Sequence, residues 1–429
     1  SEQLMTATHY QEVERKIGIS LVSGETRMYE VEEDLSNSLR KESPILRLIT
    51  LSRLKKTPLK SEYNLSDLEY TWVEVDYVAR SLAQYKKEHN LYDYTDMLEL
   101  FANSAHETCP EFDLAMIDEA QDLSPLQWDI AHAIEKKSTR MYCAGDDDQA
   151  IYKWSGADVD HFINLNGSSE VLKQSYRVPR LIHRIAENIS SRMSHRFPKQ
   201  YLPKQEEGMT KRITGLEELN LEQGSWLFLA QAKFHLAGAQ NFLKSQGLFF
   251  EYNGGLHSVR LKVRQALEAW KLLQQGKPVV FDLVKTLYSY MTGNGVRIAR
   301  GHKKIIGDEE DTFTFEELRD HHGLLVTQDM SWQEALDKIP SVDVAYINAL
   351  VRRGEDLTQP PRIKLSTIHG AKGGEADNVV LYTDLTAAAE ESMERDADSI
   401  HRVFYVAVTR SKQNLFIMEP ENYNRSYAI

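Results

Sequence analysis

Residues 114–122 read LAMIDEAQD, an apolar run that ends abruptly in acidic residues. The four apolar residues 114–117 predict a short buried strand of a parallel sheet, because such strands are covered on both faces. Asp118 and Glu119 then lie at the carboxyl end of the strand, the edge where open α/β sheets bind ligands. Asp118 is suited to hold Mg²⁺, and Glu119 is suited to take a proton from an attacking water. An acidic loop that caps the following helix explains this stretch, taken alone, equally well.

The composition is that of an ordinary globular protein with more than one domain. The 429 residues are 41% hydrophobic and 27% charged, and the length exceeds what one core supports. The net charge of −13 argues against a protein that coats nucleic acid through overall positive charge, but it allows a local basic groove. Two cysteines are too few for a disulfide framework. Without a secretion signal or a membrane-length apolar run, we expect a cytoplasmic or nucleoid-associated protein.

A second predicted strand delivers further polar residues to the same edge. Residues 140–144 are followed by GDDDQAIYKWSGAD, residues 145–158. Gln149 is suited to position a water or to sense a terminal phosphate, because its amide both donates and accepts hydrogen bonds. Tyr152 and Trp154 flank a lysine, a cluster suited to stacking on nucleic-acid bases. As isolated aromatic residues they would more often belong to a core.

Two arginines follow further along the chain. A short strand is predicted at residues 171–172, before the sequence QSYRVP. In that sequence Tyr176 offers a ring for an adenine, and Arg177 precedes a helix started by proline, from which its guanidinium could bind phosphate oxygens. Arg410 is predicted at the end of a helix over residues 399–411. Each of these residues, taken alone, is typical of an ordinary surface.

A glycine-rich turn lies between two predicted strands of the second half. It reads IHGAKGGEADNVVL after a strand at residues 363–367. Gly373 allows close backbone approach, while Thr367, His369 and Lys372 supply hydrogen-bond donors. Glu375 can accept from a ribose hydroxyl. Such turns are common, so this one carries weight only with the other clusters.

The order and spacing of these clusters resemble motifs two to six of superfamily 1 DNA helicases of the UvrD, Rep and PcrA type. The matching stretches are DEAQD, GDDDQAIYKWSGAD, QSYRVP, LSTIHGAKGGEADNVVL and YVAVTRSK. The resemblance implies an α/β fold with two RecA-like parallel-sheet lobes and helical insertions. It implies an incomplete first lobe over 1–165 with an insertion at about 25–90, a second lobe over 166–255 and 355–429, and a helical insertion domain over 256–354.

The same resemblance implies a role for each candidate residue. The expected substrate and cofactor are ATP and Mg²⁺, and the expected partners are single-stranded DNA and junctions of duplex and single strand, with movement from 3′ to 5′ and no membrane. For catalysis it implies Asp118 on magnesium, Glu119 on the hydrolytic water, Gln149 on the γ-phosphate, and Arg177 and Arg410 as arginine fingers. For nucleotide binding it implies Tyr176, Gly373 and Glu375, and for DNA binding Tyr152, Trp154, Thr367, His369 and Lys372.

One motif of the family does not occur in these residues. No GxxxxGK[ST] phosphate loop, the Walker A segment, is found, and the pair Gly276-Lys277 is followed by Pro278. We expect an ATP-dependent DNA helicase or single-stranded DNA translocase, or the large fragment of a split one with a separate chain supplying the Walker A segment. The alternative is a catalytically inactive single-stranded DNA-binding or assembly subunit. The intact acids and arginines favour the first interpretation. The aromatic cluster at Tyr152 and Trp154 disfavours an ATPase unrelated to nucleic acid.

Overall fold

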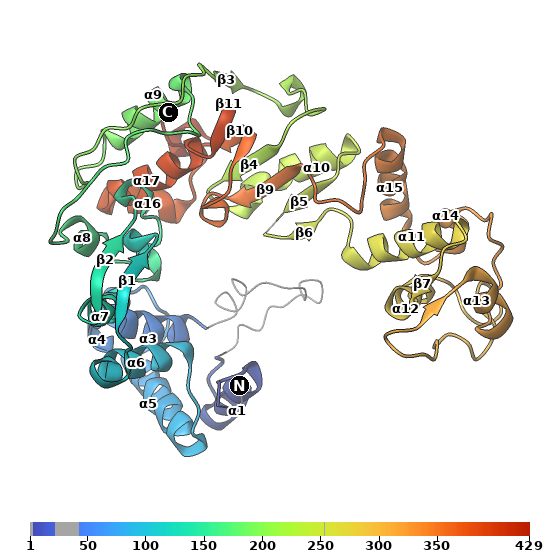
Figure 1. Ribbon diagram of the computed structural model, residues 1–429, viewed down its shortest axis with the longest axis horizontal. Helices are drawn as coiled ribbons and strands as arrows, with labels where there is room; N and C mark the ends of the chain where they lie inside the picture. Colours follow the sequence, from blue (N-terminus) through green and yellow to red (C-terminus); the bar gives the residue numbers. More distant parts are fainter. Residues whose placement is uncertain (1–2, 22–42, 253) are drawn as a thin grey trace. The chain divides into compact units, whose positions relative to one another are not determined.

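The computed structural model describes residues 3–21, 43–252 and 254–429 (Figure 1). The chain forms two compact units. The first comprises Ser1–Gly208 and Thr386–Arg410, and the second comprises Met209–Leu385 and Ser411–Ala428. The domain boundaries expected from the sequence stay a prediction, and part of the expected insertion at 25–90, residues 25–42, lies outside the described residues.

The first unit opens with a group of helices, most of which contribute side chains to one apolar core. Its helices are α1 (Ala7–Ile17), α3 (Pro44–Leu54), α4 (Leu59–Asn64), α5 (Trp72–His89) and α6 (Tyr94–Thr108). Val13 of α1, Ile45 of α3 and Val75 of α5 are all nearly fully buried in this core. Thr71 and Glu74 form a capping box at the start of α5, which satisfies backbone donors that would otherwise lack partners. The helices expected within about 25–90 are therefore confirmed for the described residues, while the insertion itself stays a prediction.

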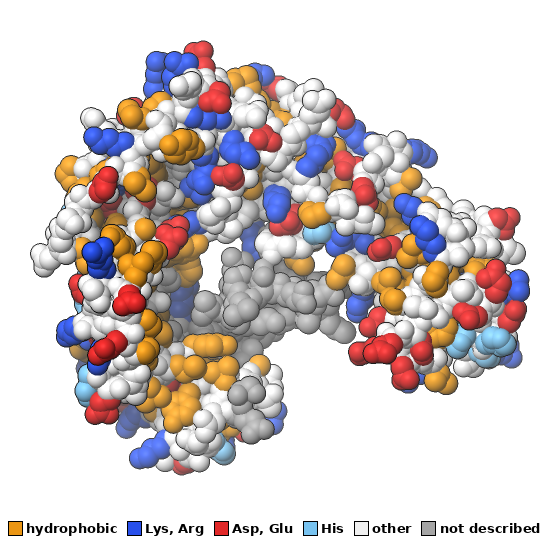
Figure 2. All heavy atoms as spheres, viewed as in Figure 1, with side chains coloured by type: hydrophobic (Ala, Val, Ile, Leu, Met, Phe, Trp, Pro, Cys, Tyr) orange, Lys and Arg blue, Asp and Glu red, His pale blue; other side chains and the backbone are white. Residues whose placement is uncertain are grey.

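A two-stranded parallel sheet follows these helices. Strand β1 (Phe112–Ile117) pairs with β2 (Ser138–Cys143), and α7 (Pro125–Glu135) connects them. One face of the sheet packs on α7, where Trp128 is 2% exposed. The other face is open: Leu114 is 44% exposed, Met116 72% and Tyr142 57%, and hydrophobic side chains show at the surface in this region (Figure 2). The prediction of a strand buried on both faces is wrong, because within the described residues helix α7 covers only one side.

The remaining elements of the first unit are mostly short, and its longest are the helices α9 and α17. They are η1 (Ala120–Asp122), η2 (Asp147–Gln149), η3 (Lys153–Ser155), α8 (Val159–Ile163), α9 (Arg180–Ser190), α16 (Ala387–Arg395) and α17 (Ala397–Val408). The strand predicted at residues 171–172 is wrong, since Leu172 is 83% exposed and has no ladder partner. The chain makes only an isolated parallel bridge nearby, between Gln174 and Leu202.

The second unit is built on a seven-stranded sheet (Figure 1). The strand order is β3-β11-β10-β4-β9-β5-β6, parallel except for the β5–β6 pair. The strands are β3 (Met209–Ile213), β4 (Trp226–Ala230), β5 (Phe250–Tyr252), β6 (Leu256–His257), β9 (Ile363–Thr367), β10 (Ala376–Tyr382) and β11 (Ser411–Met418). All five residues of β4 are buried, which is typical of a central strand covered on both faces. Helix α10 (Ala237–Ser245) contributes Leu243 to the core on one face.

A helical region is inserted between β6 and β9. It contains α11 (Leu261–Gln274), α12 (Phe281–Ser289), α13 (Phe315–His321), α14 (Trp332–Ala335) and α15 (Ser341–Arg353), with a small hairpin of β7 (Val279–Val280) and β8 (Thr312–Phe313). Trp270, Leu287 and Ile347 lie in its apolar core. The expectation of a helix-rich region here is confirmed. Across the described residues, no helix combines the length and apolar character that crossing a bilayer requires.

Candidate functional site

The two leading acids lie where β1 ends, as the sequence predicts. Both Asp118 and Glu119 are exposed. The Asp118 Oδ1 accepts a hydrogen bond of 2.9 Å from the backbone N–H of Glu119. Glu119 itself has φ +52°, a left-handed conformation that costs a non-glycine residue about 1–3 kcal/mol and is often found at functional sites. This turn directs the chain into η1 and leaves both carboxylates at the carboxyl edge of the sheet.

A continuous chain of hydrogen bonds runs from Glu119 to Arg410 within the first unit. Gln121 donates from Nε2 to Glu119 Oε2 (2.5 Å), and its Oε1 accepts from the backbone N–H of Asp146 (2.9 Å). Gln149 donates from Nε2 to Asp146 Oδ2 (2.8 Å), and its Oε1 accepts from Arg410 Nη2 (3.0 Å). The structure therefore connects three of the sequence-predicted residues, Glu119, Gln149 and Arg410.

Gln121 is a residue that sequence reasoning missed. Its side chain is completely buried, and it links the loops that follow β1 and β2. A Cβ at Gly145 would lie 2.4 Å from Gln121 Oε1, so this position of the amide requires glycine at residue 145. Both residues stand in the quoted motifs, but nothing in the sequence alone pairs them.

Arg410 is held inside the first unit. It is 2% exposed, and its Nε donates to the Val406 carbonyl at 3.0 Å. Its Nη2 also lies 3.3 Å from Thr409 Oγ1. A buried guanidinium with several oriented acceptors is pre-positioned, which is what an arginine that stabilises charge requires.

A cavity of about 460 Å³ lies beside this arginine in the first unit. Both predicted arginines line it, and the lining includes Gln149, Arg177, Lys199, Tyr201, Tyr405 and Arg410. Burial raises the pKa values of Tyr201 and Tyr405, so both phenols stay protonated and can donate hydrogen bonds. Tyr176 is 87% exposed, so its ring faces solvent.

The two predicted stacking residues lie together after η2. Trp154 is 51% exposed, and its ring meets Tyr152 edge-on, with 6.2 Å between centroids. The guanidinium of Arg47 lies 5.0 Å from the Trp154 ring centroid, a cation–π contact. Burial, and then the negative charges of Asp122 and Glu119, raise the pKa of Tyr152. The aromatic pair is thus close to the acids at the end of β1.

The remaining predicted residues lie in the second unit and are described there alone. They occupy the connection between β9 and β10: Thr367, His369, Lys372, Gly373 and Glu375. Thr367 Oγ1 accepts from the backbone N–H of Gly370 at 3.2 Å, which closes the turn at the end of β9. Gly373 has φ +82°, where a side chain would be strained. Glu375 lies 3.6 Å from the ammonium of Lys412.

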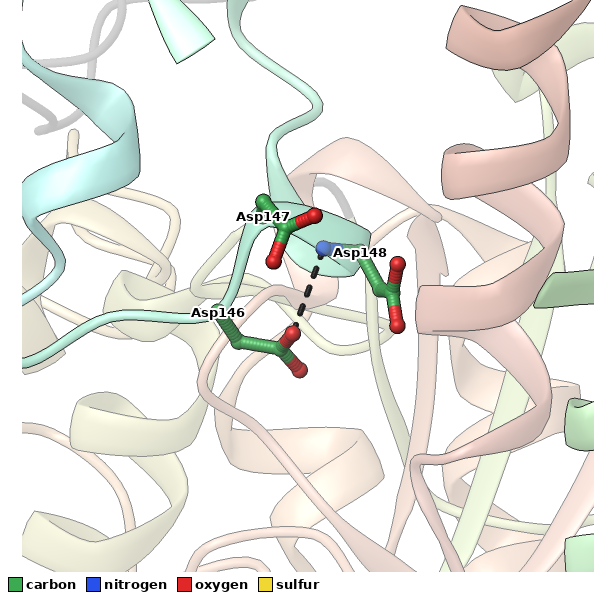
Figure 3. Close-up of side chains that lie close together, drawn as sticks. All are labelled: Asp146, Asp147 and Asp148. Carbon is green, nitrogen blue, oxygen red and sulfur yellow. Dashed lines mark hydrogen bonds between the residues drawn. The ribbon is translucent and has the colours of Figure 1, made fainter. Parts of the chain in front are cut away.

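Three consecutive carboxylates follow β2 and form a cluster, Asp146, Asp147 and Asp148 (Figure 3). Their oxygens lie within 4.8 Å of one another. The ammonium of Lys199 contacts all three carboxylates. Because the ammonium of Lys199 already occupies the position between these carboxylates, we do not assign a metal to the cluster. The exposed carboxylate of Asp118 is the oxygen donor that fits Mg²⁺.

Comparisons with known proteins agree with this geometry. Residues 4–170 match the model of the UvrD/REP helicase N-terminal domain, and residues 331–422 match that of the UvrD-like helicase C-terminal domain. The chain belongs to the UvrD-like helicase family. The mixed α/β fold with its large, mostly parallel sheet is accordingly RecA-like, as the sequence predicted.

Individual relatives of this UvrD-like chain carry helicase names. A probable DNA helicase II homolog of Rickettsia felis is 22% identical, over 91% of this chain and 74% of the relative. The ATP-dependent DNA helicase PcrA of Bacillus subtilis is 30% identical, over 23% of this chain and 14% of the relative. The ATP-dependent DNA helicase Rep of Buchnera aphidicola is 23% identical, over 39% of this chain and 27% of the relative.

Proposed function

We propose that this chain is the motor part of an ATP-dependent DNA helicase that translocates on single-stranded DNA from 3′ to 5′. The observation that carries the proposal is the hydrogen-bond chain from Glu119 through Gln149 to Arg410. Hydrolysis of ATP depends on positioning a water and on stabilising charge at the transferred phosphoryl group. The hydrogen-bond chain connects the residue types that position the water and stabilise the charge.

Each residue in the proposed site has a chemical task. Glu119 accepts a proton from the attacking water, and Gln149 orients that water through an amide that donates and accepts. Arg410 and Arg177 stabilise the charge on the transferred phosphoryl oxygens. Bound Mg²⁺, held at Asp118, would neutralise charge on the phosphates of ATP. Tyr176, Gly373 and Glu375 bind the nucleoside part.

The proposed DNA contacts lie in both units. Trp154 and its edge-on neighbour Tyr152 stack on bases, because the half-exposed ring of Trp154 offers a face that accepts any base. Thr367, His369 and Lys372 contact the strand from the end of β9. Junctions of duplex and single strand are the proposed substrate.

The open face of β1 and β2 supports a further part of the proposal. All-parallel sheets are normally covered on both faces, yet Leu114, Met116 and Tyr142 are exposed here. We propose that a segment bearing the phosphate loop packs on this face, because the printed residues lack that loop. Expressing the 429 residues alone and with a candidate loop-bearing segment tests this. ATP hydrolysis and co-purification only in the second case support the proposal.

DNA-stimulated ATP hydrolysis is the decisive measurement. The proposal expects phosphate release that rises with single-stranded DNA once the loop-bearing segment is present. The competing function, a non-hydrolysing DNA-binding or assembly subunit, is favoured by the absence of the loop in these residues. It predicts DNA affinity that is sensitive to salt and indifferent to nucleotide. Such indifference, with no hydrolysis, would overturn the helicase proposal.

The direction of movement needs its own assay. Streptavidin is bound to biotin at either end of an oligonucleotide, and its displacement by the protein with ATP is timed. Movement from 3′ to 5′ displaces it faster from the 5′ end. Faster displacement from the 3′ end contradicts the proposed direction but leaves the ATPase intact.

A further inference from the structure

Residues 194–199, which we call the strap, lie between α9 and β3 and connect two parts of the proposed site. On one side of the strap is α17, which ends at Val408, two residues before Arg410. On the other side is the loop of residues 146–149, which carries Gln149. The hydrogen bond between Gln149 and Arg410 therefore joins two elements that the strap also joins.

The strap is fixed to α17 by a buried carboxylate and a buried guanidinium. Asp398 accepts hydrogen bonds from the backbone N–H of Ser194 (2.9 Å), its hydroxyl (3.0 Å) and the backbone N–H of His195 (2.8 Å). Arg402 donates to the carbonyl of His195 at 2.6 Å and to that of Asp147 at 2.8 Å. Arg402 thus contacts strap and loop from the same helix.

The strap is fixed to the loop by charge. Arg196 donates from Nε to Asp148 Oδ1 at 2.9 Å, and the backbone N–H of Phe197 donates to Asp147 Oδ2 at 2.8 Å. Lys199 contacts all three aspartates, with 3.1 Å to Asp146 Oδ1 and 3.2 Å to Asp148 Oδ2. Asp147 and Asp148 are almost completely buried. The loop conformation therefore depends on cations that the strap supplies.

Three carboxylates enclose the ammonium of Lys199. An ammonium has three N–H donors, and three carboxylates surround this one, whose side chain is 5% exposed. Burial alone would lower the pKa of Lys199, but the charges of the three aspartates raise it above its usual value. Lys199 lines the cavity beside Arg410, but the contacts of its ammonium are with the three aspartates of the loop.

We propose that Lys199 is a positioning residue, which gathers the aspartates of the loop so that Gln149 meets Arg410. The inference rests on the proposed ATP hydrolysis and adds the device that orders its site. Without the ammonium, Arg196 is the strap cation that remains beside three carboxylates, two of them almost completely buried, and leaving buried charge uncompensated is strongly destabilising. The loop then opens, and Gln149 loses both Asp146 and Arg410 as partners.

The test compares Lys199→Met with Lys199→Arg, which keeps the charge, and with Lys136→Met, the same change at an exposed lysine. For Lys199→Met we expect kcat for ATP to fall about 10- to 100-fold, because the groups are misplaced. KM should change by less than about threefold, because Lys199 does not touch the nucleotide. Lys199→Arg should recover much of the kcat, and Lys136→Met should match the unmodified protein.

Hydrogen exchange of the amides of residues 145–151 gives a readout without ATP. We expect it to be about tenfold faster in Lys199→Met. If that variant folds poorly, Asp147→Asn is added to remove a buried charge, and the double variant should fold but keep a low kcat. The inference is overturned if Lys199→Met, or the double variant, has the same amide exchange and the same kcat as the unmodified protein. All kcat values here are measured with the loop-bearing segment present. If the unmodified protein does not hydrolyse ATP even then, the proposed function fails, while the exchange result still tests the strap.

Discussion

The two units of this helicase use parallel strands in different ways. In the second unit β4 is buried along its whole length, among six other strands. In the first unit β1 has one neighbour and an open face, and the loop after β2 contains ion pairs that are mostly buried, such as Lys199 with Asp148. Apolar packing thus stabilises the second sheet, whereas hydrogen bonds and buried charge order the edge of the first. The catalytic tasks are proposed for the sheet that has the smaller apolar core.

The sharpest test of this difference compares Glu119→Gln with Glu375→Gln, one at each sheet edge. Loss of a general base should lower ATP turnover about 10²- to 10⁴-fold. Loss of a ribose contact should raise KM only about 2- to 10-fold, as for one ordinary hydrogen bond. Steady-state phosphate release with single-stranded DNA measures both, and Asp113→Asn, on β1 but away from its carboxyl end, is the control. Similar effects of the two substitutions would contradict the assignment of the chemistry to the first edge.

The comparison also shows how far the sequence could be interpreted. The run LAMI predicts the strand β1, which is confirmed, and the apolar run WLFLA forms the strand β4. Only the second strand is buried on both faces, because burial depends on which helices and strands arrive from elsewhere in the chain. The strand predicted at residues 171–172 does not form, because two apolar residues do not specify a partner strand.

The candidate site shows the same division between local and distant information. Glu119 and Gln149 could be placed at a sheet edge, because each follows a predicted strand. The strap contacts of Arg196 and Lys199 could not be predicted, since their partners are about 50 residues away and ion pairing leaves no periodic pattern. Gln121 was missed because its partners are a backbone amide and a neighbouring acid.

Stability should separate the two sheets next. Phe228 in β4 is fully buried, so Phe228→Ala should lower the free energy of unfolding by about 3–5 kcal/mol. Met116 in β1 is 72% exposed, and Met116→Ala should cost less than about 0.5 kcal/mol in the 429-residue chain. Urea denaturation followed by tryptophan fluorescence measures both. A large cost at Met116 would mean that its face is already covered, and would remove the docking surface proposed for the loop-bearing segment.

The aromatic pair of the first unit should have a smaller effect, on DNA. Trp154→Ala should weaken single-stranded DNA binding by about 1–3 kcal/mol, because one base loses its stacking partner. Tyr423→Ala is the matched control, since that ring is 71% exposed but lies in the second unit. Fluorescence anisotropy of a labelled oligonucleotide, at fixed salt, gives both affinities. An equal loss in both variants would indicate a general charge or folding effect in place of stacking.

The smallest expected effect concerns two charged clusters of the first unit, which should respond to acid with opposite signs. At Asp93, burial favours the neutral form, but Lys86 and Arg53 outweigh it and lower the pKa below 3.8. Asp93 therefore adds stability above that pH, about 1 kcal/mol or less, which disappears as the pH falls through its folded pKa. Asp93→Asn should weaken the loss of stability in acid.

At Asp148, burial raises the pKa in spite of Arg196, so its ionised form costs stability as the pH rises through and above 3.8. Asp148→Asn should therefore weaken the loss of stability that occurs as the pH rises. Melting temperatures of both variants and of the unmodified protein between pH 3 and 6 measure the two effects. Effects of the same sign would show that both clusters are solvated alike.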